Sequence, residues 1–229
     1  MTLKRVTKQQ ESKGATNTSN ALSSAKTGAF ISRLAGGLCF DFNPEDSNTY
    51  IVGTDDGNIH RCSCTLSEQY LATHFGHTGP VYRIRWSPFL SGTFLSCSAD
   101  WTVRLWNQDS EDATLRFQSG KDSVSDIAWS PNSSTVFGCV SIDGSFAIWD
   151  LGFSVLDPVI LHSVLDRKLT CIVFAENSPS VMIGDDTGSV NVYKIHNLAN
   201  ISNLTDQEQA DLLAKVVDTS LMSRVAPVA

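Results

Sequence analysis

The 229-residue sequence contains no long apolar run, no apolar stretch at its N-terminus and no excess of basic residues. A membrane-spanning helix needs about 18 consecutive apolar residues, so neither such a helix nor a secretory signal peptide is expected. Lysine and arginine number 17 against 24 aspartates and glutamates, which gives a formal net charge of −7. Because proteins that bind nucleic acid through its phosphates present a basic surface, the sequence predicts neither a membrane nor a nucleic-acid partner.

Motifs typical of enzyme active sites are also absent. The sequence has no glycine-rich phosphate loop, nucleophile elbow or metal motif, which predicts no catalytic activity, no cofactor and no small-molecule substrate. His60, Cys62 and Cys64 alternate on one strand face, where residues two apart lie about 6–7 Å from each other. That spacing suits a tetrahedral ion poorly, so we expect packing and no metal. The six cysteines are expected to be reduced thiols, and the protein is expected in the cytoplasm.

The first 33 residues differ from the rest in charge and composition. They hold six basic side chains and one acidic side chain, a net of +5, which leaves −12 on residues 34–229. Polar residues and glycine dominate this segment, so it cannot bury enough apolar surface to offset its conformational entropy. We predict a disordered basic leader over residues 1–33. A targeting peptide is the weaker alternative, because the segment lacks amphipathic periodicity.

Three kinds of position recur with one period between residues 34 and 195. An aromatic residue before a turn recurs after 44, 43 and 45 residues, and both a tight-turn position and a closing position recur after 44, 43 and 44 residues. A period of roughly 40–45 residues with strand-like segments is typical of β-propeller blades. The three series are Phe42, Trp86, Trp129 and Phe174; Gly57, Trp101, Gly144 and Gly188; and Cys62, Trp106, Trp149 and Tyr193.

Each repeat contains short strand-like segments. In the second repeat they lie at about 81–87, 94–98, 102–107 and 113–118. Four antiparallel strands of about six residues form one blade, which must stack on its neighbours to bury both faces. We predict an all-β WD-repeat β-propeller with blades at about 34–75, 76–118, 119–162 and 163–195. Propellers of this type usually close with about six to eight blades, so we expect these four to be part of a larger propeller.

The tail, residues 196–229, has a different pattern. Thr205 and Glu208 form a capping box, in which the hydroxyl and the carboxylate satisfy free N–H groups at a helix start. Apolar residues then recur at helical spacing, which predicts an amphipathic C-terminal α-helix over about residues 206–221. Two roles for this helix are open: it covers a rim of the propeller, or it docks on a partner helix.

The second repeat carries polar residues that can form a hydrogen-bonded chain. His77, Ser96, the turn residue Asp100 and Trp106 occupy positions from which a loop, a hairpin and two strands can be linked. Ser98 is an alternative to Ser96, because both lie on one strand face. A Ser-His-Asp nucleophile is the competing interpretation, and we disfavour it because a repeat scaffold uses these residues for structure.

Hairpin turns carry two further features. Asp55-Asp56 and Asp185-Asp186 are paired carboxylates, but aspartate favours turns for conformational reasons, so turn chemistry explains them. The turn position that is glycine in three repeats is Trp101 in the second. A tryptophan at a hairpin tip is either partly exposed, as residues at binding hot spots are, or folded back onto the adjacent blade.

The repeats resemble those of dynein intermediate chains. The most specific stretches are GTDDGNIHRCS at residues 53–63 and SCSADWTVRLW at residues 96–106. Residues 31–195 as a whole look like the C-terminal WD repeats of this family, with the axonemal members, and among them the inner-arm type, most similar.

The resemblance implies a non-catalytic scaffold subunit that supports the motility of a cilium or flagellum. It would bind a dynein heavy chain through its propeller, together with other dynein intermediate and light chains, in the cytoskeleton of the axoneme. Its contacts would lie on the face that bears the hairpins between second and third strands. The partner-binding candidates on that face are Trp101, His77, Asp56, Asp143 and Asp186.

A generic WD-repeat adaptor, such as a substrate receptor of a ubiquitin ligase, is the alternative function. Such receptors often carry an arginine two residues after their Trp-Asp pair. Here Leu151-Gly152 follow Trp149-Asp150, which favours the dynein interpretation.

Overall fold

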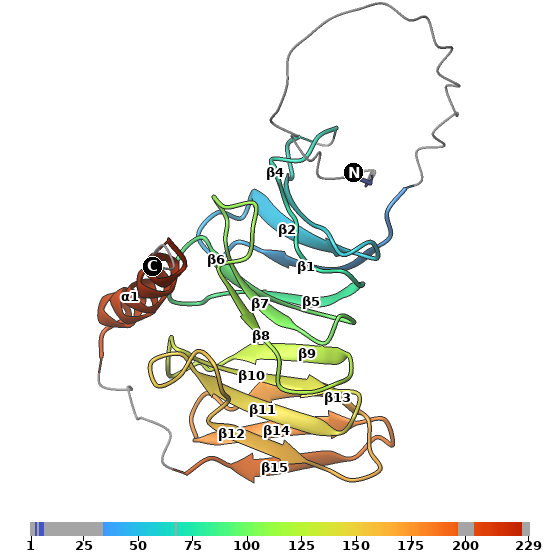
Figure 1. The fold of residues 1–229 in the computed structure, drawn as a ribbon, viewed down its shortest axis with the longest axis vertical. Helices are drawn as coiled ribbons and strands as arrows, with labels where there is room; N and C mark the ends of the chain where they lie inside the picture. Colours follow the sequence, from blue (N-terminus) through green and yellow to red (C-terminus); the bar gives the residue numbers. More distant parts are fainter. Residues whose placement is uncertain (1–2, 4, 7–33, 67, 197–203, 226–229) are drawn as a thin grey trace, which may run out of the picture.

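The computed structural model describes residues 3, 5–6, 34–66, 68–196 and 204–225. In these residues fifteen β-strands form four antiparallel sheets that follow one another along the chain, and one α-helix comes after the last sheet. Figure 1 shows the sheets stacked in chain order, with the helix beside the stack. Within this described part, no helix has the length and hydropathy needed to span a bilayer. This is the all-β arrangement of successive blades that the repeats predict.

We call the four sheets blades one to four. Blade one comprises β1 (Gly37–Phe42), β2 (Thr49–Thr54), β3 (Ile59–Ser63) and β4 (Ala72–His74). Blade two comprises β5 (Val81–Trp86), β6 (Thr93–Ser98), β7 (Val103–Asn107) and β8 (Leu115–Phe117). Blade three comprises β9 (Val124–Trp129), β10 (Val136–Ser141), β11 (Ser145–Asp150) and β12 (Ile160–Ser163). Blade four comprises β13 (Leu169–Phe174), β14 (Ser180–Asp185) and β15 (Val190–Lys194).

The strands lie within the predicted blade ranges, apart from β12, whose last residue is Ser163 instead of residue 162. The helix α1 (Asp206–Val225) starts at the predicted residue and continues beyond residue 221. Within residues 1–33, for which the sequence predicts disorder, the structure describes Leu3, Arg5 and Val6, which contact blade one. The Leu3 carbonyl accepts a hydrogen bond from Ala35 N at 3.0 Å, and Arg5 pairs with Asp55 at 3.0 Å. The remainder of the leader lies outside the described residues.

Apolar side chains fill the three interfaces between successive blades. The first interface joins Ile51 and Ile59 of blade one to Ile84 and Trp86 of blade two. The interface between blades two and three is larger and includes Leu105, Trp129 and Trp149, and the one between blades three and four includes Ile148 and Ile172. Full burial of an aliphatic or phenylalanine side chain stabilises a fold by about 1.5–3 kcal/mol, so these interfaces hold the stack together.

One aromatic arrangement is repeated in blades two and three. The Phe94 and Trp106 rings are stacked with centroids 6.1 Å apart and an angle of 11° between their planes. In blade three, Phe137 and Trp149 have the same separation of 6.1 Å and an angle of 6°. Both tryptophans are about 1% exposed. The closing aromatic of the repeat is thus a core residue, packed on the second strand of its own blade.

A buried carboxylate ties the innermost strands together. Asp126 on β9 is 4% exposed. It accepts a hydrogen bond from Arg83 Nε of blade two at 2.7 Å and one from Ile172 N of blade four at 3.1 Å. Asp41 on β1 makes a similar tie to blade two, accepting from Trp86 N at 2.9 Å. These bonds fix the position of each blade relative to the next.

The helix α1 lies against loops of blades two and three, at the end of the blades opposite the turns between second and third strands. Leu213 and Val217 are buried in the core between these blades, and the partly buried Leu90 and Val216 pack on the same core. Ser134 N donates to Gln209 Oε1 at 2.8 Å, and Ser134 Oγ donates to the Gln209 carbonyl at 2.6 Å. Of the two roles left open by the sequence, the helix performs the first: it covers a rim of the propeller.

We expect Asp126→Ala to lower the free energy of unfolding by about 2–3 kcal/mol, because it leaves a guanidinium and a buried backbone N–H without their acceptor. Urea denaturation of the purified chain measures the change. The matched variant is Asp41→Ala, which removes fewer hydrogen bonds. Because the Asp41 side chain is 27% exposed, this variant should lower the free energy of unfolding by less. Equal losses for the two variants would contradict the role assigned to Asp126.

Candidate protein-binding face

One end of the blades presents a continuous surface of hairpins and loops. It consists of the turns between second and third strands at residues 55–58, 99–102, 142–144 and 186–189, and of the loops 75–80, 118–123 and 164–168 that join successive blades. Each turn is bonded to the loop before its own blade: Ala99 N donates to the Pro80 carbonyl at 3.0 Å, and Ile142 N to the Ser123 carbonyl at 3.0 Å. We call this surface the hairpin face.

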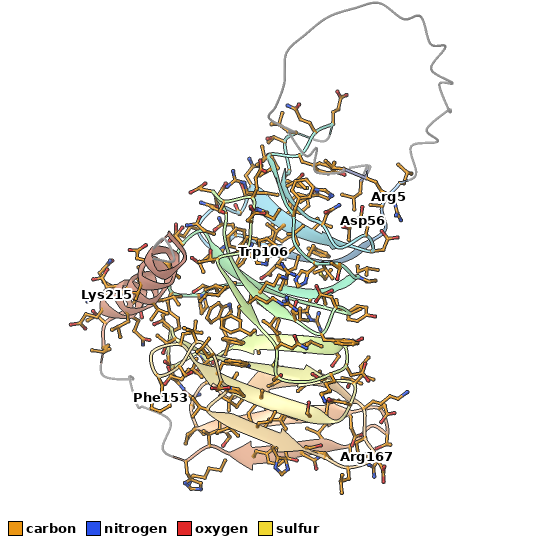
Figure 2. The ribbon with its side chains drawn as sticks, viewed as in Figure 1. Arg5, Asp56, Trp106, Phe153, Arg167 and Lys215 are labelled. Carbon is orange, nitrogen blue, oxygen red and sulfur yellow. The ribbon has the colours of Figure 1, made fainter. Side chains whose placement is uncertain are left out.

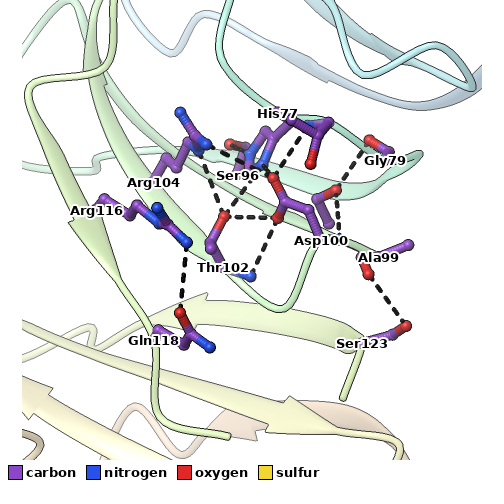
Figure 3. A network of polar contacts seen from close by, with 12 residues as sticks. His77, Gly79, Ser96, Ala99, Asp100, Thr102, Arg104, Arg116, Gln118 and Ser123 are labelled. Atoms are coloured by element: carbon purple, nitrogen blue, oxygen red, sulfur yellow. Dashed lines mark hydrogen bonds and ion pairs between the residues drawn. The ribbon is translucent and has the colours of Figure 1, made fainter. Parts of the chain in front are cut away.

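The predicted polar residues of blade two form a chain of hydrogen bonds behind this face, of which Figure 3 shows His77, Ser96 and Asp100. His77 Nδ1 lies 2.9 Å from Asp100 Oδ2, and His77 Nε2 lies 2.6 Å from Ser96 Oγ. Trp106 Nε1 lies 2.8 Å from the same Ser96 oxygen. The chain therefore joins the loop before β5, the hairpin between β6 and β7, and both of those strands.

The direction of each bond follows from the available protons. The Trp106 indole only donates, so Ser96 Oγ accepts from it and gives its single proton to His77 Nε2. His77 Nδ1 then carries the remaining proton and donates it to Asp100. A neutral imidazole satisfies this order, and burial lowers the pKa of His77 against the opposing influence of the Asp100 carboxylate.

Asp100 is the acceptor at the end of the chain. It also accepts from Thr102 Oγ1 at 2.6 Å and from Thr78 N at 3.1 Å. Burial acts to raise the pKa of Asp100, but the hydrogen bonds from His77 and Thr102 outweigh it and hold the pKa well below the ordinary value. The carboxylate therefore stays charged and clamps the hairpin to the loop before its blade. Sequence reasoning missed Thr102, although its place two residues after a turn aspartate is a recognisable signal.

Ser96 and Ser98 have different roles. Ser96 is fully buried and its hydroxyl is shared between His77 and Trp106, so the chain acts as a brace and presents no nucleophile to solvent. Ser98 Oγ donates to the Gly79 carbonyl at 2.9 Å and accepts from Asp100 N at 3.1 Å. The alternative of Ser98 as the third member is therefore wrong.

Blade three has lost this brace. Gly120 stands where blade two has His77, and Cys139 stands where it has Ser96. Trp149 Nε1 is buried and has no hydrogen-bond partner among the described residues. Asp143 instead accepts from Ser145 N at 2.9 Å and Ser145 Oγ at 2.6 Å, within its own turn.

Trp101 lies at the tip of the braced hairpin and is 46% exposed. Its φ is 69°, in the left-handed region that a bulky residue adopts only under strain. The equivalent residues are Gly57, Gly144 and Gly188, with φ between 83° and 87°. A Cβ at Gly57 or Gly144 would meet a backbone oxygen at 2.6 or 2.4 Å, respectively, so neither of those two turns has room for the side chain that the blade-two turn holds.

The structure brings four of the five partner-binding candidates to the surface of the hairpin face. Trp101, Asp143 and Asp186 reach the surface and Asp56 is half-buried. The side chain of His77, by contrast, is 0% exposed. His77 therefore cannot touch a partner, because the hydrogen-bond chain that motivated its choice also encloses it. Asp56 binds Thr54 Oγ1 inside its own turn, and Asp186 accepts from Lys168 N at 3.3 Å.

The three residues considered for a metal do not converge. His60 stacks on Tyr70, with ring centroids 3.8 Å apart, and bonds Thr73 Oγ1 at 3.0 Å. Cys62 is buried and Cys64 is exposed. Across the described residues, no group of three histidine, cysteine, aspartate or glutamate side chains is arranged to hold a metal ion.

Ser96→Ala should lower the free energy of unfolding by about 2–4 kcal/mol, because it leaves both Trp106 Nε1 and His77 Nε2 buried without a partner. Thermal or urea denaturation measures the loss. Cys139→Ala changes the equivalent buried position of blade three, where no such brace exists, and we expect it to cost less. Equal costs at the two positions would mean that the brace adds nothing to stability.

Three buried histidines predict a loss of stability in mild acid. Burial lowers the pKa of His60 to about 4 and also lowers those of His74 and His77. Below about pH 6.5 the unfolded chain binds protons that the folded chain does not, so the free energy of unfolding falls by up to about 1.4 kcal/mol per pH unit for each histidine.

Urea denaturation between about pH 7 and pH 4.5 measures this slope. His60→Phe keeps a ring to stack on Tyr70 and cannot be protonated, so its slope should be shallower. An unchanged slope would show that His60 titrates normally in the fold.

Known proteins resemble this chain in both repeats and fold. Residues 68–107 and 112–150 match the family model described as “WD domain, G-beta repeat”, and these segments contain β5–β7 and β9–β11. The solved C-terminal WD40 domain of Sif2 is similar, with a TM-score of 0.58 and 20% identity over 69% of this chain and 44% of that one. At this identity the likeness shows the propeller fold.

Proteins with higher sequence identity to this chain identify its family. Dynein axonemal intermediate chain 4 of Xenopus laevis is 54% identical over 158 residues, which are 69% of this chain and 21% of the relative. The Homo sapiens protein of that name is 43% identical over 202 residues, which are 88% of this chain and 23% of the relative. The chain thus spans less than a quarter of the length of these relatives. With its WD repeats and this level of identity, the chain belongs to the dynein intermediate chain family.

Proposed function

We propose that this chain is a non-catalytic scaffold subunit of an axonemal dynein, placed in the axoneme of a cilium or flagellum. Its relatives are named as axonemal, and one from Heliocidaris crassispina as ciliary, which supports that location. The hairpin face binds a dynein heavy chain, and the brace of blade two keeps that surface rigid. Other intermediate and light chains of the motor belong to the same assembly.

The observation that carries the proposal is that Trp101 is exposed and has a strained backbone conformation. A bulky residue in the left-handed region costs about 1–2 kcal/mol relative to glycine, which occupies this turn in the other three blades. At 46% exposure, the tryptophan leaves nearly half of its surface in water, so burial offsets this cost only in part. Strain of this kind persists at sites of function, and tryptophan is enriched at the energetic centres of protein interfaces.

The surroundings of Trp101 suggest the chemistry of its partner. Asp143 and Asp186 lie at the surface of other turns of the same face, and residues 34–229 carry a net charge of −12. An apolar pocket with basic residues around it would complement a face that carries an exposed indole and, on other turns, carboxylates. We therefore propose that the heavy chain offers such a basic, apolar surface.

Catalysis finds no support in the geometry. Ser96, His77 and Asp100 are the serine, histidine and aspartate that could suggest a nucleophile, and they are buried and hydrogen-bonded to one another within blade two. The alternative of a ubiquitin-ligase receptor is supported by no contact described above, and the curated relatives carry dynein names.

Trp101→Gly and Trp101→Ala separate binding from strain. Both variants remove the indole and should reduce recovery of dynein heavy chain from ciliated-cell extract at least tenfold, the loss expected of a residue worth about 2 kcal/mol or more. Quantitative mass spectrometry of pull-downs measures recovery. Only Trp101→Gly also relieves the left-handed backbone, so it should raise the free energy of unfolding of the isolated chain by about 1 kcal/mol over Trp101→Ala.

Phe153→Ser is the control for a general loss of exposed aromatic surface. Phe153 is 82% exposed and follows β11, at the end of blade three remote from the hairpin face (Figure 2). This variant should retain heavy chain. Full recovery of heavy chain by both Trp101 variants would overturn the proposed contact.

A further inference from the structure

Two arginines lie directly opposite each other on the outer strands of blade two. Arg104 on β7 is the register partner of Arg116 on β8, and Cβ atoms of such partners are about 4.5–5.5 Å apart. Figure 3 shows both side chains beside the polar network of His77 and Asp100. Like charges directly opposite each other destabilise a sheet. The pair is therefore a feature that blade two tolerates at a cost in stability.

The propeller fold does not require two cations at this place. The first member of the pair stands two residues before the closing position of its repeat. The equivalent register partners are His60 and Thr73 in blade one, and Ala147 and Leu161 in blade three. Of the three blades with four described strands, blade two alone pairs two arginines here. A purely structural role does not explain this choice.

The two guanidinium groups use few of their donors within the protein. Arg104 Nε donates to Thr102 Oγ1 at 3.4 Å, and Arg104 Nη2 lies 3.6 Å from Asp100 Oδ2. Arg116 Nη2 donates to Gln118 Oε1 at 3.4 Å, and Arg116 forms no ion pair with any described residue. Because a guanidinium carries several N–H donors in a planar fork, most of them remain for another acceptor.

Arg104 is fixed in position, whereas Arg116 faces solvent. The Arg104 side chain is only 14% exposed, and a Cβ on Gly76 would lie 2.5 Å from Arg104 Nη1, so the loop before blade two packs on the guanidinium. Burial lowers the pKa of Arg104, and the charge of Arg116 adds to this effect against the opposing influence of Asp100. Arg116 is exposed. A second anion entering from solvent would therefore meet one preorganised cation and one accessible cation.

We infer that Arg104 and Arg116 together bind the phosphate group of a phosphorylated side chain on a partner polypeptide. Arginine forks bind carboxylates and phosphates through paired hydrogen bonds. A carboxylate has two oxygens and fits one fork, whereas a phosphate monoester has three acceptor oxygens and a charge of about −1.5 to −2. The phosphate can therefore engage both guanidinium groups and offset their mutual repulsion.

The charge of the rest of the chain narrows the kind of partner. Residues 34–229 carry a net charge of −12, so the arginine pair lies in an acidic molecule. An acidic surface repels a polypeptide that is acidic throughout and attracts one with basic residues beside its phosphorylated side chain. The partner segment that fits is basic apart from the phosphate.

Titration of the full chain with N-acetyl phosphoserine amide tests the inference. The side-chain Nε–H resonances of isotope-labelled arginine report binding, and those of Arg104 and Arg116 should shift together. Arg116→Gln should weaken binding at least about tenfold, because it removes charge-assisted hydrogen bonds to the phosphate. Arg116→Lys keeps the charge without the planar fork and should lose less affinity than Arg116→Gln.

Two controls separate the site from general electrostatic attraction. Arg85→Gln removes the same charge from β5, three strands away in the same sheet, where the Arg85 side chain is 42% exposed. This variant should bind the phosphoserine compound as the wild-type chain does. The α-amide of N-acetylglutamate offers a carboxylate in place of the phosphate and should bind at least about tenfold more weakly than the phosphoserine compound.

Thermal stability gives a second, independent readout. Without ligand, Arg116→Gln relieves the repulsion and should raise the thermal midpoint by about 1–3 °C. The phosphoserine compound should raise the midpoint of the wild-type chain and leave that of Arg116→Gln nearly unchanged, because a ligand stabilises only a fold that binds it.

Four results would overturn the inference. They are no binding by the wild-type chain, equal binding by Arg116→Gln, equal affinity for the carboxylate compound, and a thermal midpoint that falls in Arg116→Gln, which would give the pair a structural role. None of these measurements involves heavy chain or a change at Trp101, so they stand apart from the proposed function.

Discussion

The packing of one blade on the next is the constraint on which the whole molecule depends. Each sheet carries apolar side chains on both faces and has strands of about six residues, too small a surface to be stable alone. Trp86, Trp129 and Ile172 of the innermost strands are buried only because a neighbouring blade covers them. In the part of the chain that the structure describes, Phe40 at one end of the stack and Val192 at the other are exposed.

A rigid stack turns its loops into a defined surface. The turns between second and third strands are each hydrogen-bonded to the loop before their own blade. The hairpin face is therefore held in a fixed position on the packed core. The cross-blade bonds of Asp126 and Asp41 serve the same end from the inner strands. A surface of this kind can bind a partner without first paying the entropy of ordering its own loops.

The brace of blade two and the strain at Trp101 are two parts of one device. Asp100 precedes Trp101 and Thr102 follows it, and these two residues are bonded to each other and, through His77, to the loop before β5. A left-handed conformation survives where the surrounding bonds over-determine the backbone. In blade three the brace is lost, and the turn there has glycine at position 144. The braced hairpin is thus the one that presents an aromatic side chain to solvent.

The sequence by itself determined the repeats, the all-β class, the helix start marked by Thr205 and Glu208, and three members of the hydrogen-bond chain, His77, Asp100 and Trp106, because each depends on local spacing or on the chemistry of one turn. Tertiary structure alone decided that His77 is enclosed, that Ser96 and not Ser98 accepts the hydrogen bond from Trp106, and that α1 covers blades two and three. It also placed Leu3 and Arg5 on blade one. These outcomes depend on which distant segments meet in space, and a pattern along one chain does not contain that information until the blades have packed.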